Sequence, residues 1–429
     1  MIIKPSTLGT TVALAAVGLL PQLVNAQEWT RFRGPNGSGI GDAPSMPAKF
    51  NEADFEWIIE LPGTGHSSPV LWGKKLFLTV AASEEAERRV LCYDSTSGEQ
   101  IWEWSEPFEE YHKHQFNDFA SATPVVDEHA VYMTWTSGRE TRALALDHNG
   151  KKLWEDSWKG FSSDHGSAAS PILVEGTLVL HTDALEERKS YLYGINPSNG
   201  EQLWSRERIS PPEDEKHLTA YSTPVVSSIG GRTCVVFLST NDGWMGVDPK
   251  NGEELWHFRD AYKFRSVGSI AEDGGVLFAT MGSGDSGKQA AALRLKSDGE
   301  VEQLFSFGSN GDKEKNKTLS YVPTPILHDG LLYLWKDNGQ VTCMDALTGE
   351  VIYSERIAGG QYFSSPVLVD GKIYGANRHG VMVVVKAGRE FEVLAENKLD
   401  SGVNATPAIA NGRMFIRTDT HLMSLKGGS

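Results

Sequence analysis

The chain has 429 residues, with 56 Asp and Glu against 40 Lys and Arg, and a formal net charge of −16 at pH 7. Nucleic acid and anionic membrane surfaces repel a chain with this excess of negative charge, so neither is expected as its main partner. The length is ample for a large buried core, and proteins or small ligands are left as the expected partners.

The first 26 residues have the pattern of a cleavable secretory signal peptide. They contain one charged side chain, Lys4, then an apolar run at 12–20 and a small-residue ending at Ala26. The run is shorter than the roughly 20 residues that a membrane-spanning helix needs, and no later segment would span a bilayer. We therefore expect cleavage after Ala26 and a periplasmic or secreted protein.

The next segment, 27–54, is rich in residues that favour turns. It contains Trp29 and Phe32, followed by Gly34-Pro35-Asn36-Gly37. We expect an ordered N-terminal cap that packs on the rest of the molecule through the two aromatic side chains.

A repeated signal divides the remainder, 55–429, into eight units. In seven copies a Ser or Thr precedes a Pro and a short apolar run, and an eighth copy at Ser269 lacks the Pro. Pro is tolerated at the first position of a strand. The Pro residues of the seven complete copies are Pro69, Pro124, Pro171, Pro224, Pro325, Pro366 and Pro407.

Each unit reads as four short antiparallel strands. After the apolar run comes a turn dipeptide such as Asp370-Gly371 or Asn411-Gly412, which supplies the positive φ of a tight hairpin. Two further apolar strands follow, and then a strand that carries a Trp. Four strands repeated eight times predict an all-β fold, an eight-bladed β-propeller.

The end of the third strand and the start of the fourth share a second pattern, in which an acidic or amide residue is followed by Gly and then by Trp. Asp248, Gly252 and Trp256 show it with a spacing of four residues at each step. The other copies are Asp94, Gly98 and Trp102; Asp147, Gly150 and Trp154, which is one residue shorter; Asn196, Gly200 and Trp204; and Asp345, Gly349 and Tyr353, in which Tyr replaces Trp.

The two ends of the chain complement each other. The last unit supplies only three strands, whereas an unpaired strand at 55–61 carries Trp57 in a fourth-strand context. We predict that this N-terminal strand completes the eighth blade and closes the ring, which removes an exposed sheet edge.

The Asp-x-x-x-Gly-x-x-x-Trp repeat resembles the tryptophan-docking motif of the pyrroloquinoline quinone (PQQ) repeat propellers, and the resemblance covers about 55–425. It implies that Trp57, Trp102, Trp154, Trp204, Trp256 and Tyr353 are structural and dock between blades. The opening Trp29-Thr30-Arg31-Phe32-Arg33-Gly34 is similar to that of exported PQQ-like bacterial propellers.

Two branches of that superfamily imply different functions. One contains non-catalytic binding or scaffolding propellers such as the BamB-like lipoproteins, whose lipid-bearing Cys is missing here. The other contains PQQ- and calcium-dependent alcohol or sugar dehydrogenases, and Lys263, Arg265 and Trp244 could be proposed for a quinone site. The larger quinone enzymes have adjacent cysteines that this chain lacks, so a binding module is the leading interpretation and the dehydrogenase is the alternative.

Strand order predicts where a binding site would lie. Links between blades, and links from the second to the third strand of a blade, must share one face, and several are long and variable. Side chains just before each first strand should rim the central channel and mix hydrogen-bonding groups with aromatic rings. The candidate ligand-binding residues are His66, Asn117, His165, Tyr221, Arg265, Tyr321, Tyr362 and Asn404.

Metal and redox chemistry find little support in the sequence. His112 and His114 could offer two imidazoles, but no third ligand is identifiable. The three cysteines, Cys92, Cys234 and Cys343, are an odd number and lie in different repeats, so we expect buried free thiols. No catalytic residue is proposed, and the partner is expected to be an envelope or extracellular protein or a small ligand.

Overall fold

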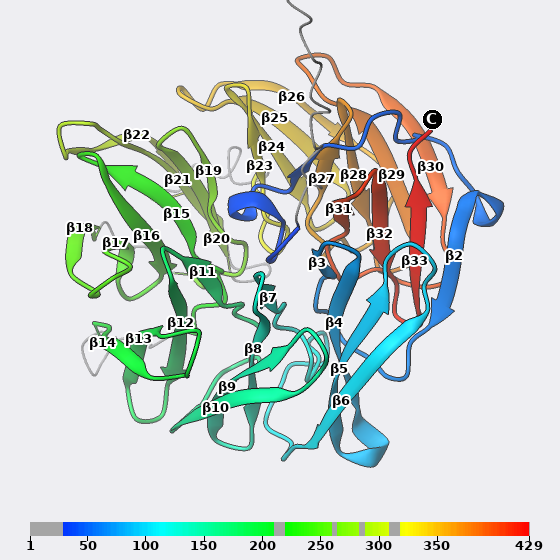
Figure 1. Cartoon of the computed structure of the whole chain (residues 1–429). Coiled ribbons are helices and arrows are strands. Elements are labelled where there is room, and N and C mark those ends of the chain that lie inside the picture. Colours follow the sequence, from blue (N-terminus) through cyan, green and yellow to red (C-terminus); the bar gives the residue numbers. More distant parts are fainter. Residues whose placement is uncertain (1–28, 210–218, 260–263, 283–287, 309–317, 429) are drawn as a thin grey trace, which may run out of the picture.

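Eight antiparallel sheets of four strands are arranged in a ring in the computed structural model, and one sheet gains a short fifth strand (Figure 1). The structure describes residues 29–209, 219–259, 264–282, 288–308 and 318–428. The expected signal peptide lies outside these residues. The prediction of an eight-bladed β-propeller is confirmed.

The first four blades each use four consecutive strands. Blade 1 has β3 (Val70–Trp72), β4 (Lys75–Ala82), β5 (Glu87–Asp94) and β6 (Gln100–Pro107). Blade 2 has β7 (Val125–Val126), β8 (Ala130–Ser137), β9 (Glu140–Asp147) and β10 (Lys152–Lys159). Blade 3 has β11 (Ile172–Val174), β12 (Thr177–Ala184), β13 (Lys189–Ile195) and β14 (Gln202–Glu207). Blade 4 has β15 (Val225–Ile229), β16 (Arg232–Ser239), β17 (Gly243–Val247) and β18 (Glu254–Phe258).

Blades 5 to 7 follow the same order. Blade 5 has β19 (Ala271–Asp273), β20 (Val276–Gly282), β21 (Lys288–Leu295) and β22 (Val301–Phe307). Blade 6 has β23 (Ile326–His328), β24 (Leu331–Lys336), β25 (Gln340–Asp345) and β26 (Val351–Arg356). Blade 7 has β27 (Val367–Val369), β28 (Lys372–Ala376), β29 (Val381–Lys386) and β30 (Val393–Lys398), with β1 (Ile40–Gly41) parallel to β27.

Both ends of the chain build blade 8. It contains β31 (Ala408–Ala410), β32 (Arg413–Arg417), β33 (His421–Lys426) and, as its outer strand, β2 (Phe55–Glu60), which pairs antiparallel to β33 with Phe55 opposite Leu425. The ring is therefore closed by the N-terminal strand, as predicted. Short 3₁₀ turns complete the described elements: η1 (Pro35–Gly37), η2 (Glu52–Asp54) and η3 (Ser83–Glu85).

Residue composition follows the position of a strand in its blade. The second and third strands, such as β4, are buried on both faces because a neighbouring blade covers each side. The outer strands, such as β6, are mostly exposed or partly exposed. All three cysteines lie on buried strands without a disulfide, and burial raises the pKa of Cys92 to about 12.

The fourth-strand Trp side chains connect neighbouring blades. The Nε1 of Trp204 donates to the carbonyl of Pro249 at 2.8 Å, and its ring covers Gly252, both in the next blade. Trp57, Trp102 and Trp154 contact the following turn in the same way, with Nε1–O distances of 3.3, 2.9 and 2.7 Å. Trp57 thus gives the blade 8–blade 1 interface the same contact as the interfaces between consecutive blades.

Two positions of the motif differ. Trp256 does not repeat the contact, because an added Cβ on Gly299, the turn glycine of blade 5, would meet no atom within 4 Å. Tyr353 contacts Phe391 with ring centroids 5.4 Å apart. Gly349 is covered by Phe305 and by a second Phe of β22, so phenylalanine takes the place of Trp in blade 5.

The Ser or Thr before each Pro also joins neighbouring blades by a hydrogen bond, which the sequence repeat alone did not predict. Its backbone N–H donates to the hydroxyl of the equivalent residue in the next blade, and seven such bonds measure 2.9–3.2 Å. The last of them joins Thr406 of blade 8 to Ser68 of blade 1. The Ser/Thr-Pro pattern therefore marks the start of each first strand, and its hydroxyl residues also form a series of hydrogen bonds around the ring axis.

Residues 29–41 lie at the ring axis as an axial plug (Figure 1). Arg33 donates to the carbonyls of Pro325 and Pro366, in blades 6 and 7, at 3.0 and 2.9 Å. Arg31 donates to the carbonyl of Pro224 in blade 4. Asn36 exchanges two hydrogen bonds with Val226 at 2.7 and 2.8 Å. The plug therefore binds the chain at the start of blades 4, 6 and 7.

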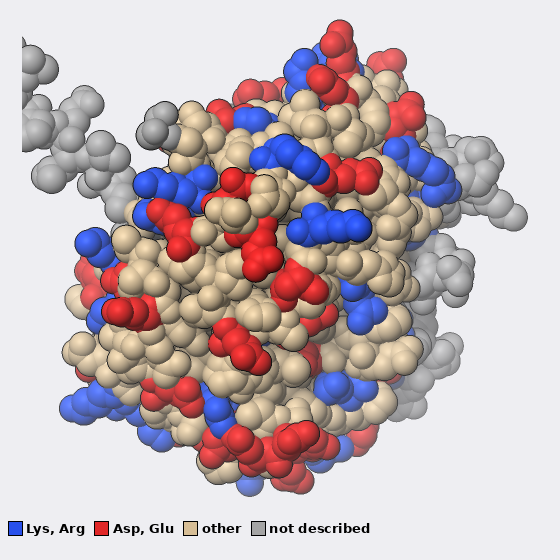
Figure 2. All heavy atoms as spheres, turned by 90° about the vertical axis from the view of Figure 1, so that its right-hand side faces the viewer, with Lys and Arg blue, Asp and Glu red and all other residues tan. Residues whose placement is uncertain are grey.

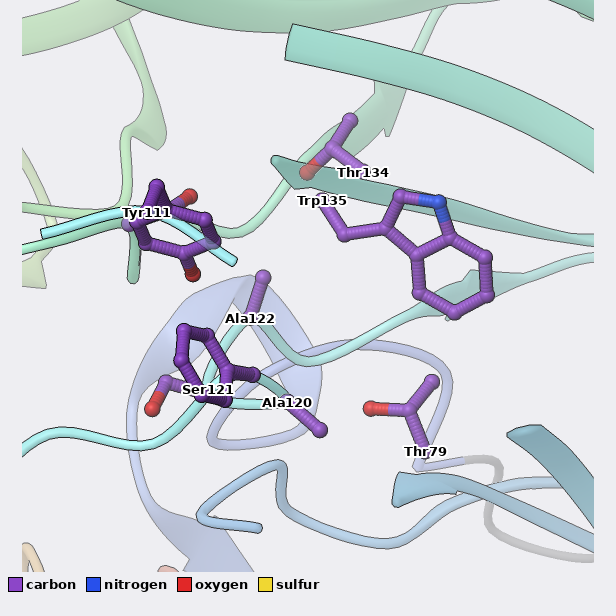
Figure 3. Close-up of a pocket in the computed structure, with 9 residues that line it drawn as sticks. Thr79, Tyr111, Ala120, Ser121, Ala122, Thr134 and Trp135 are labelled. Carbon is purple, nitrogen blue, oxygen red and sulfur yellow. The ribbon is translucent and has the colours of Figure 1, made fainter. Parts of the chain in front are cut away.

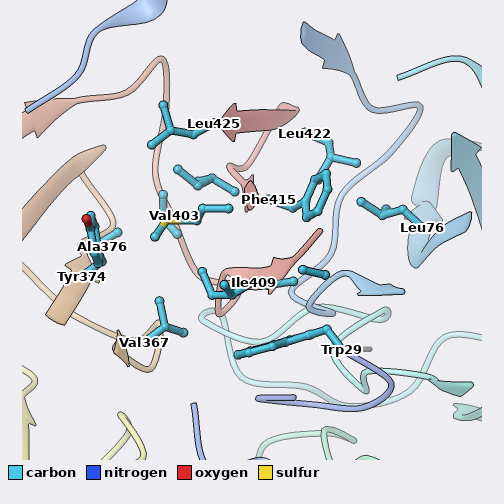
Figure 4. Close-up of a cluster of buried hydrophobic side chains, with 14 of the residues drawn as sticks. Trp29, Leu76, Val367, Tyr374, Ala376, Val403, Ile409, Phe415, Leu422 and Leu425 are labelled. Carbon is cyan, nitrogen blue, oxygen red and sulfur yellow. The ribbon is translucent and has the colours of Figure 1, made fainter. Parts of the chain in front are cut away.

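Trp29 anchors the start of this segment. It is fully buried in a cluster that includes Ile409, Phe415 and Val367 from blades 7 and 8 (Figure 4). The expectation that Trp29 packs on the ring agrees with this contact. The two plug arginines, by contrast, were not singled out in the sequence.

Candidate functional site

The antiparallel order of the strands assigns every link to one of two faces. The links between blades and the links from second to third strands lie on one face, here called the long-loop face. The tight hairpins and the Asp-Gly turns lie on the other, the short-turn face. Lys263, which was considered for a quinone site, belongs to a part of a long link outside the described residues.

A row of aromatic side chains crosses the axis on the long-loop face. Ring centroids are 6.3 Å apart for Tyr221 and His165, 5.0 Å for His165 and His114, 5.2 Å for His114 and Phe116, and 5.5 Å for Phe116 and Phe363. His165 leads into blade 3 and Phe363 into blade 7, which are opposite each other in a ring of eight. We call these five residues the aromatic bridge.

Polar contacts hold one end of the aromatic bridge in place. The Asn117 amide donates to the carbonyl of His165 at 2.8 Å, and its oxygen accepts from Ser121 at 2.6 Å. The hydroxyls of Tyr221 and Ser163 lie 3.0 Å apart. The structure therefore brings together three predicted rim residues, Asn117, His165 and Tyr221.

Arg265 and Tyr321 form a second group on the same face. The Arg265 guanidinium donates to the carboxylate of Asp164 at 3.1 Å, which links the entries to blades 3 and 5. Burial opposes the charge, but hydrogen bonds to Asp164 and Tyr321 raise the pKa of Arg265. Arg265 is thus fixed as an ion pair between links.

His66 and Asn404 lie toward blades 8 and 1. Burial lowers the pKa of His66 to about 4; Asp118 opposes this shift and nearby cations add to it, so the imidazole is neutral at pH 7. The Asn404 amide donates to Asp419 at 2.9 Å, and its oxygen accepts from Arg378 at 3.1 Å.

Tyr362 is placed differently from the other seven predicted residues. It is fully buried between blades 6 and 7, where its ring lies 5.9 Å from that of Trp335 and its hydroxyl donates to the carbonyl of Ala358 at 2.7 Å. Its neighbour Phe363 reaches the axis instead, because successive residues of an extended segment point in opposite directions.

A buried ion cluster anchors the link from blade 3 to blade 4. Arg208 donates to Asp183 at 2.9 Å and to Asp242 at 3.0 Å, and all three side chains are at most 4% exposed. The two carboxylates also accept the backbone N–H groups of Ile209 and Ala220, at the two ends of the link. The cluster therefore fixes where this link leaves and rejoins the ring.

His181 lies beside this cluster and should make stability depend on pH. Burial and, secondarily, Arg208 lower its pKa to about 4, so the unfolded chain binds a proton near pH 6.5 that the folded chain binds only near pH 4. Stability contributed by the neutral form is present above pH 6.5 and is lost as the pH falls toward 4. We expect about 2 kcal/mol of unfolding free energy to be lost between pH 7 and pH 5 through this residue.

The pH dependence of His181→Gln, measured by urea unfolding at several pH values, checks this expectation. Glutamine can keep the hydrogen bond to the Ser222 carbonyl, 3.2 Å from His181 Nε2, but does not titrate in this range. The variant should lose less stability than the parent between pH 7 and pH 5. Parallel curves for the two proteins would contradict the assignment.

A pocket between blades 1 and 2 lies below the long-loop face (Figure 3). Thr79, Ser121, Thr134 and Trp135 are among the side chains around it, and it has room for about one water molecule. It is too small for an organic cofactor.

Trp244 and Arg265, the two described residues considered for a quinone, do not form a site together. Trp244 is fully buried in the core shared by blades 4 and 5, so it cannot be the aromatic floor of a site on the axis. Arg265 is bound to Asp164. The plug and the aromatic bridge both cross the axis. The described side chains therefore do not fit PQQ.

The two histidines considered for a metal, His112 and His114, each contact other residues of the long-loop face. His112 Nε2 lies 3.2 Å from the carbonyl of Asp164, and His114 stacks on His165. Among the described residues, no group of three or more His, Cys, Asp or Glu side chains is arranged to hold a metal ion.

Sequence reasoning missed three residues at the axis: Phe116, Phe363 and Arg378. Phe116 precedes the predicted rim residue Asn117 and Phe363 follows the predicted rim residue Tyr362, so in these two cases the prediction named the adjacent residue. Arg378 lies between β28 and β29, in a second-to-third-strand link, and the candidates were taken only from links between blades. An aromatic residue in an otherwise polar link was the sequence signal that could have indicated Phe116 and Phe363.

One flank of the ring carries charges of both signs. On the side that carries β2 and β33, Figure 2 shows acidic and basic side chains interspersed rather than gathered in a patch of one sign. In the parts of the chain that the structure covers, no helix has the length and apolar character needed to cross a bilayer.

Solved structures share the architecture. The BamB structure from Moraxella catarrhalis superposes with a TM-score of 0.61 at 15% identity, over 87% of this chain and 97% of that one. A quinohemoprotein alcohol dehydrogenase from Comamonas testosteroni has a TM-score of 0.63 at 12% identity, over 94% of this chain and 81% of that one. These likenesses establish the fold.

Sequence relatives are more specific. The outer membrane protein assembly factor BamB of Yersinia pestis is 22% identical over 290 residues, which is 66% of this chain and 68% of that protein. BamB of Salmonella typhimurium is 21% identical over 305 residues, 70% and 71% of the two chains. The family model described as outer membrane protein assembly factor BamB matches residues 48–303 and 242–391. The chain therefore belongs to the BamB family of PQQ-repeat propellers.

Proposed function

We propose that this protein is an exported, non-catalytic binding module that docks other proteins on its long-loop face. The observation that carries the proposal is the aromatic bridge, which crosses the axis and so presents side chains as a surface instead of lining a ligand cavity. Partly exposed aromatic residues on a rigid scaffold are typical of protein-binding surfaces. The related proteins named as outer membrane assembly factors support a role in protein assembly.

The proposal includes the cellular location and the division of the chain. A signal peptide at 1–26, cleaved after Ala26, would deliver the protein to the periplasm or outside the cell. Residues 27–54 would form the cap, and 55–429 the propeller. The relatives' names, which refer to the outer membrane, support an envelope location.

Site-specific photocrosslinking in the native cells tests the binding face. A benzophenone amino acid would be placed at His112 or His379, exposed on the long-loop face, and at Lys250 or Asp298 on the short-turn face as matched controls. Adducts with another protein are expected from the first pair and not from the second. Monomer at all four positions, or equal adducts from both faces, would contradict the proposal.

Titration with PQQ and Ca²⁺ separates this function from the dehydrogenase alternative. The purified protein should give no saturable red shift of the quinone absorbance and no dye reduction with alcohols or sugars. A saturable shift accompanied by dye reduction would replace the binding module with an enzyme.

A further inference from the structure

Arg378 is held at the axis by neutral groups. Its guanidinium carbon lies 4.4 Å from the ring centroid of Phe116 and 5.2 Å from that of Phe363. Its Nε donates to Asn404 at 3.1 Å and its Nη1 to Gln361 at 3.2 Å. Stacking and hydrogen bonding together fix the plane of the guanidinium on the long-loop face, where the side chain is partly exposed.

Two other arginines on this face differ in one respect. Arg265 and Arg208 are paired with carboxylates, whereas no carboxylate of the described residues lies within ion-pair distance of Arg378. Its Nη2 also has no hydrogen-bond partner among those residues. In a chain with a net charge of −16, a partly exposed arginine without an ion-pair partner among the described residues is available to an anion.

The surroundings of Arg378 add positive charge. Lys113, Arg417 and Arg378 all act on His66, which is neutral at pH 7. Of the nearby carboxylates, Asp118 accepts from Thr64 at 2.7 Å, and Asp419 accepts from Asn404 at 2.9 Å while it also interacts electrostatically with Arg378 and Arg417. A third carboxylate, Asp400, acts on Asp419 and is itself hydrogen-bonded to Thr420 and His421. The region therefore contains three cations and three carboxylates, and none of these carboxylates forms an ion pair with Arg378.

We propose that Arg378 is the anchor for a carboxylate in an acidic segment of a partner protein, with Phe116 and Phe363 packing against that segment. The inference rests on the proposed function and names the chemistry of its partner. A guanidinium fork matches a carboxylate in two parallel hydrogen bonds, and arginine beside aromatic rings is the usual composition of an energetically dominant contact. A lipid phosphate is less well matched, because an anionic membrane surface repels a chain with a net charge of −16.

Fluorescence polarisation with labelled hexaglutamate and hexaglutamine peptides at low ionic strength tests the anchor. Hexaglutamate should bind the full-length protein and hexaglutamine should not. Arg378→Gln should weaken hexaglutamate binding about tenfold, and Arg378→Lys should fall between Arg378→Gln and the parent. Arg232→Gln, which makes the same charge change at an exposed residue paired with Asp248 and Glu253, should be within about twofold of the parent.

The contrary results are equally specific. Absence of hexaglutamate binding, equal binding of the two peptides, or equal effects of Arg378→Gln and Arg232→Gln would overturn the anchor. So would co-flotation with phosphatidylglycerol vesicles that depends on Arg378 while hexaglutamate does not bind. If crosslinked adducts persist unchanged in Arg378→Gln, the binding function stands and this inference fails.

Discussion

Replacing Arg33 by methionine should lower the unfolding free energy of the propeller by about 3 kcal/mol or more. Arg33 is fully buried and donates to four carbonyls, those of Gly37, Ser38, Pro325 and Pro366, at 2.9–3.1 Å. Methionine keeps the unbranched stem but leaves these buried acceptors without their charged donor. Each hydrogen bond to a charged group contributes about 1.5–3 kcal/mol, and losses within one network do not simply add.

The midpoint of urea unfolding, followed by tryptophan fluorescence, measures this loss. Arg232→Met is the matched control, because Arg232 is 51% exposed and its ion pairs with Asp248 and Glu253 are on the surface. That change should cost no more than about 1 kcal/mol. Similar midpoints for the two variants would show that the plug is not an integral part of the folded ring.

Gly252→Ala should destabilise the protein by about 3 kcal/mol, with most of the loss coming from the blade interface. Gly252 has a φ of 70°, and an added Cβ would lie 2.6 Å from the Trp204 ring. Left-handed backbone costs an alanine about 1–2 kcal/mol, and displacing a packed indole adds about 1–3 kcal/mol. The docking glycine is therefore constrained both by its backbone and by the side chain above it.

Gly371→Ala separates these two effects. Gly371 has nearly the same φ, 68°, but an added Cβ there meets no atom within 4 Å. Gly371→Ala should therefore lower the unfolding free energy only by the cost of the left-handed backbone, about 1–2 kcal/mol. Equal unfolding midpoints for Gly252→Ala and Gly371→Ala would mean that Trp204 moves aside without cost.

Repetition made the architecture predictable. Most blades repeat the Ser/Thr-Pro start, the hairpin glycine and the Trp, so a signal that is missing from one copy is supplied by the others. Blade 5 shows this redundancy, since its copy lacks the Pro and uses Phe305 where blades 1 to 4 have Trp. Closure by the N-terminal strand followed from counting strands at the two ends of the chain.

The candidate site could be predicted only in part. Asn117, His165 and Tyr221 were placed near the axis by their position before a first strand, and the structure brings them together. Tyr362 and Phe363 are neighbours in sequence, and the direction of each side chain depends on the twist of a short extended link. No pattern with a period of one blade contains that information.

What the sequence by itself determined is therefore everything that recurs: the all-β class, the number of blades, the docking turns and the face that carries the variable links. Only the tertiary structure decided what occurs once: the plug arginines that bind prolyl carbonyls, the aromatic bridge and the placement of Arg378. The physical reason is that each blade repeats the same local hydrogen bonding and packing. Contacts across the axis, by contrast, join residues hundreds of positions apart, such as Phe116 and Phe363, and exist only once the ring has closed.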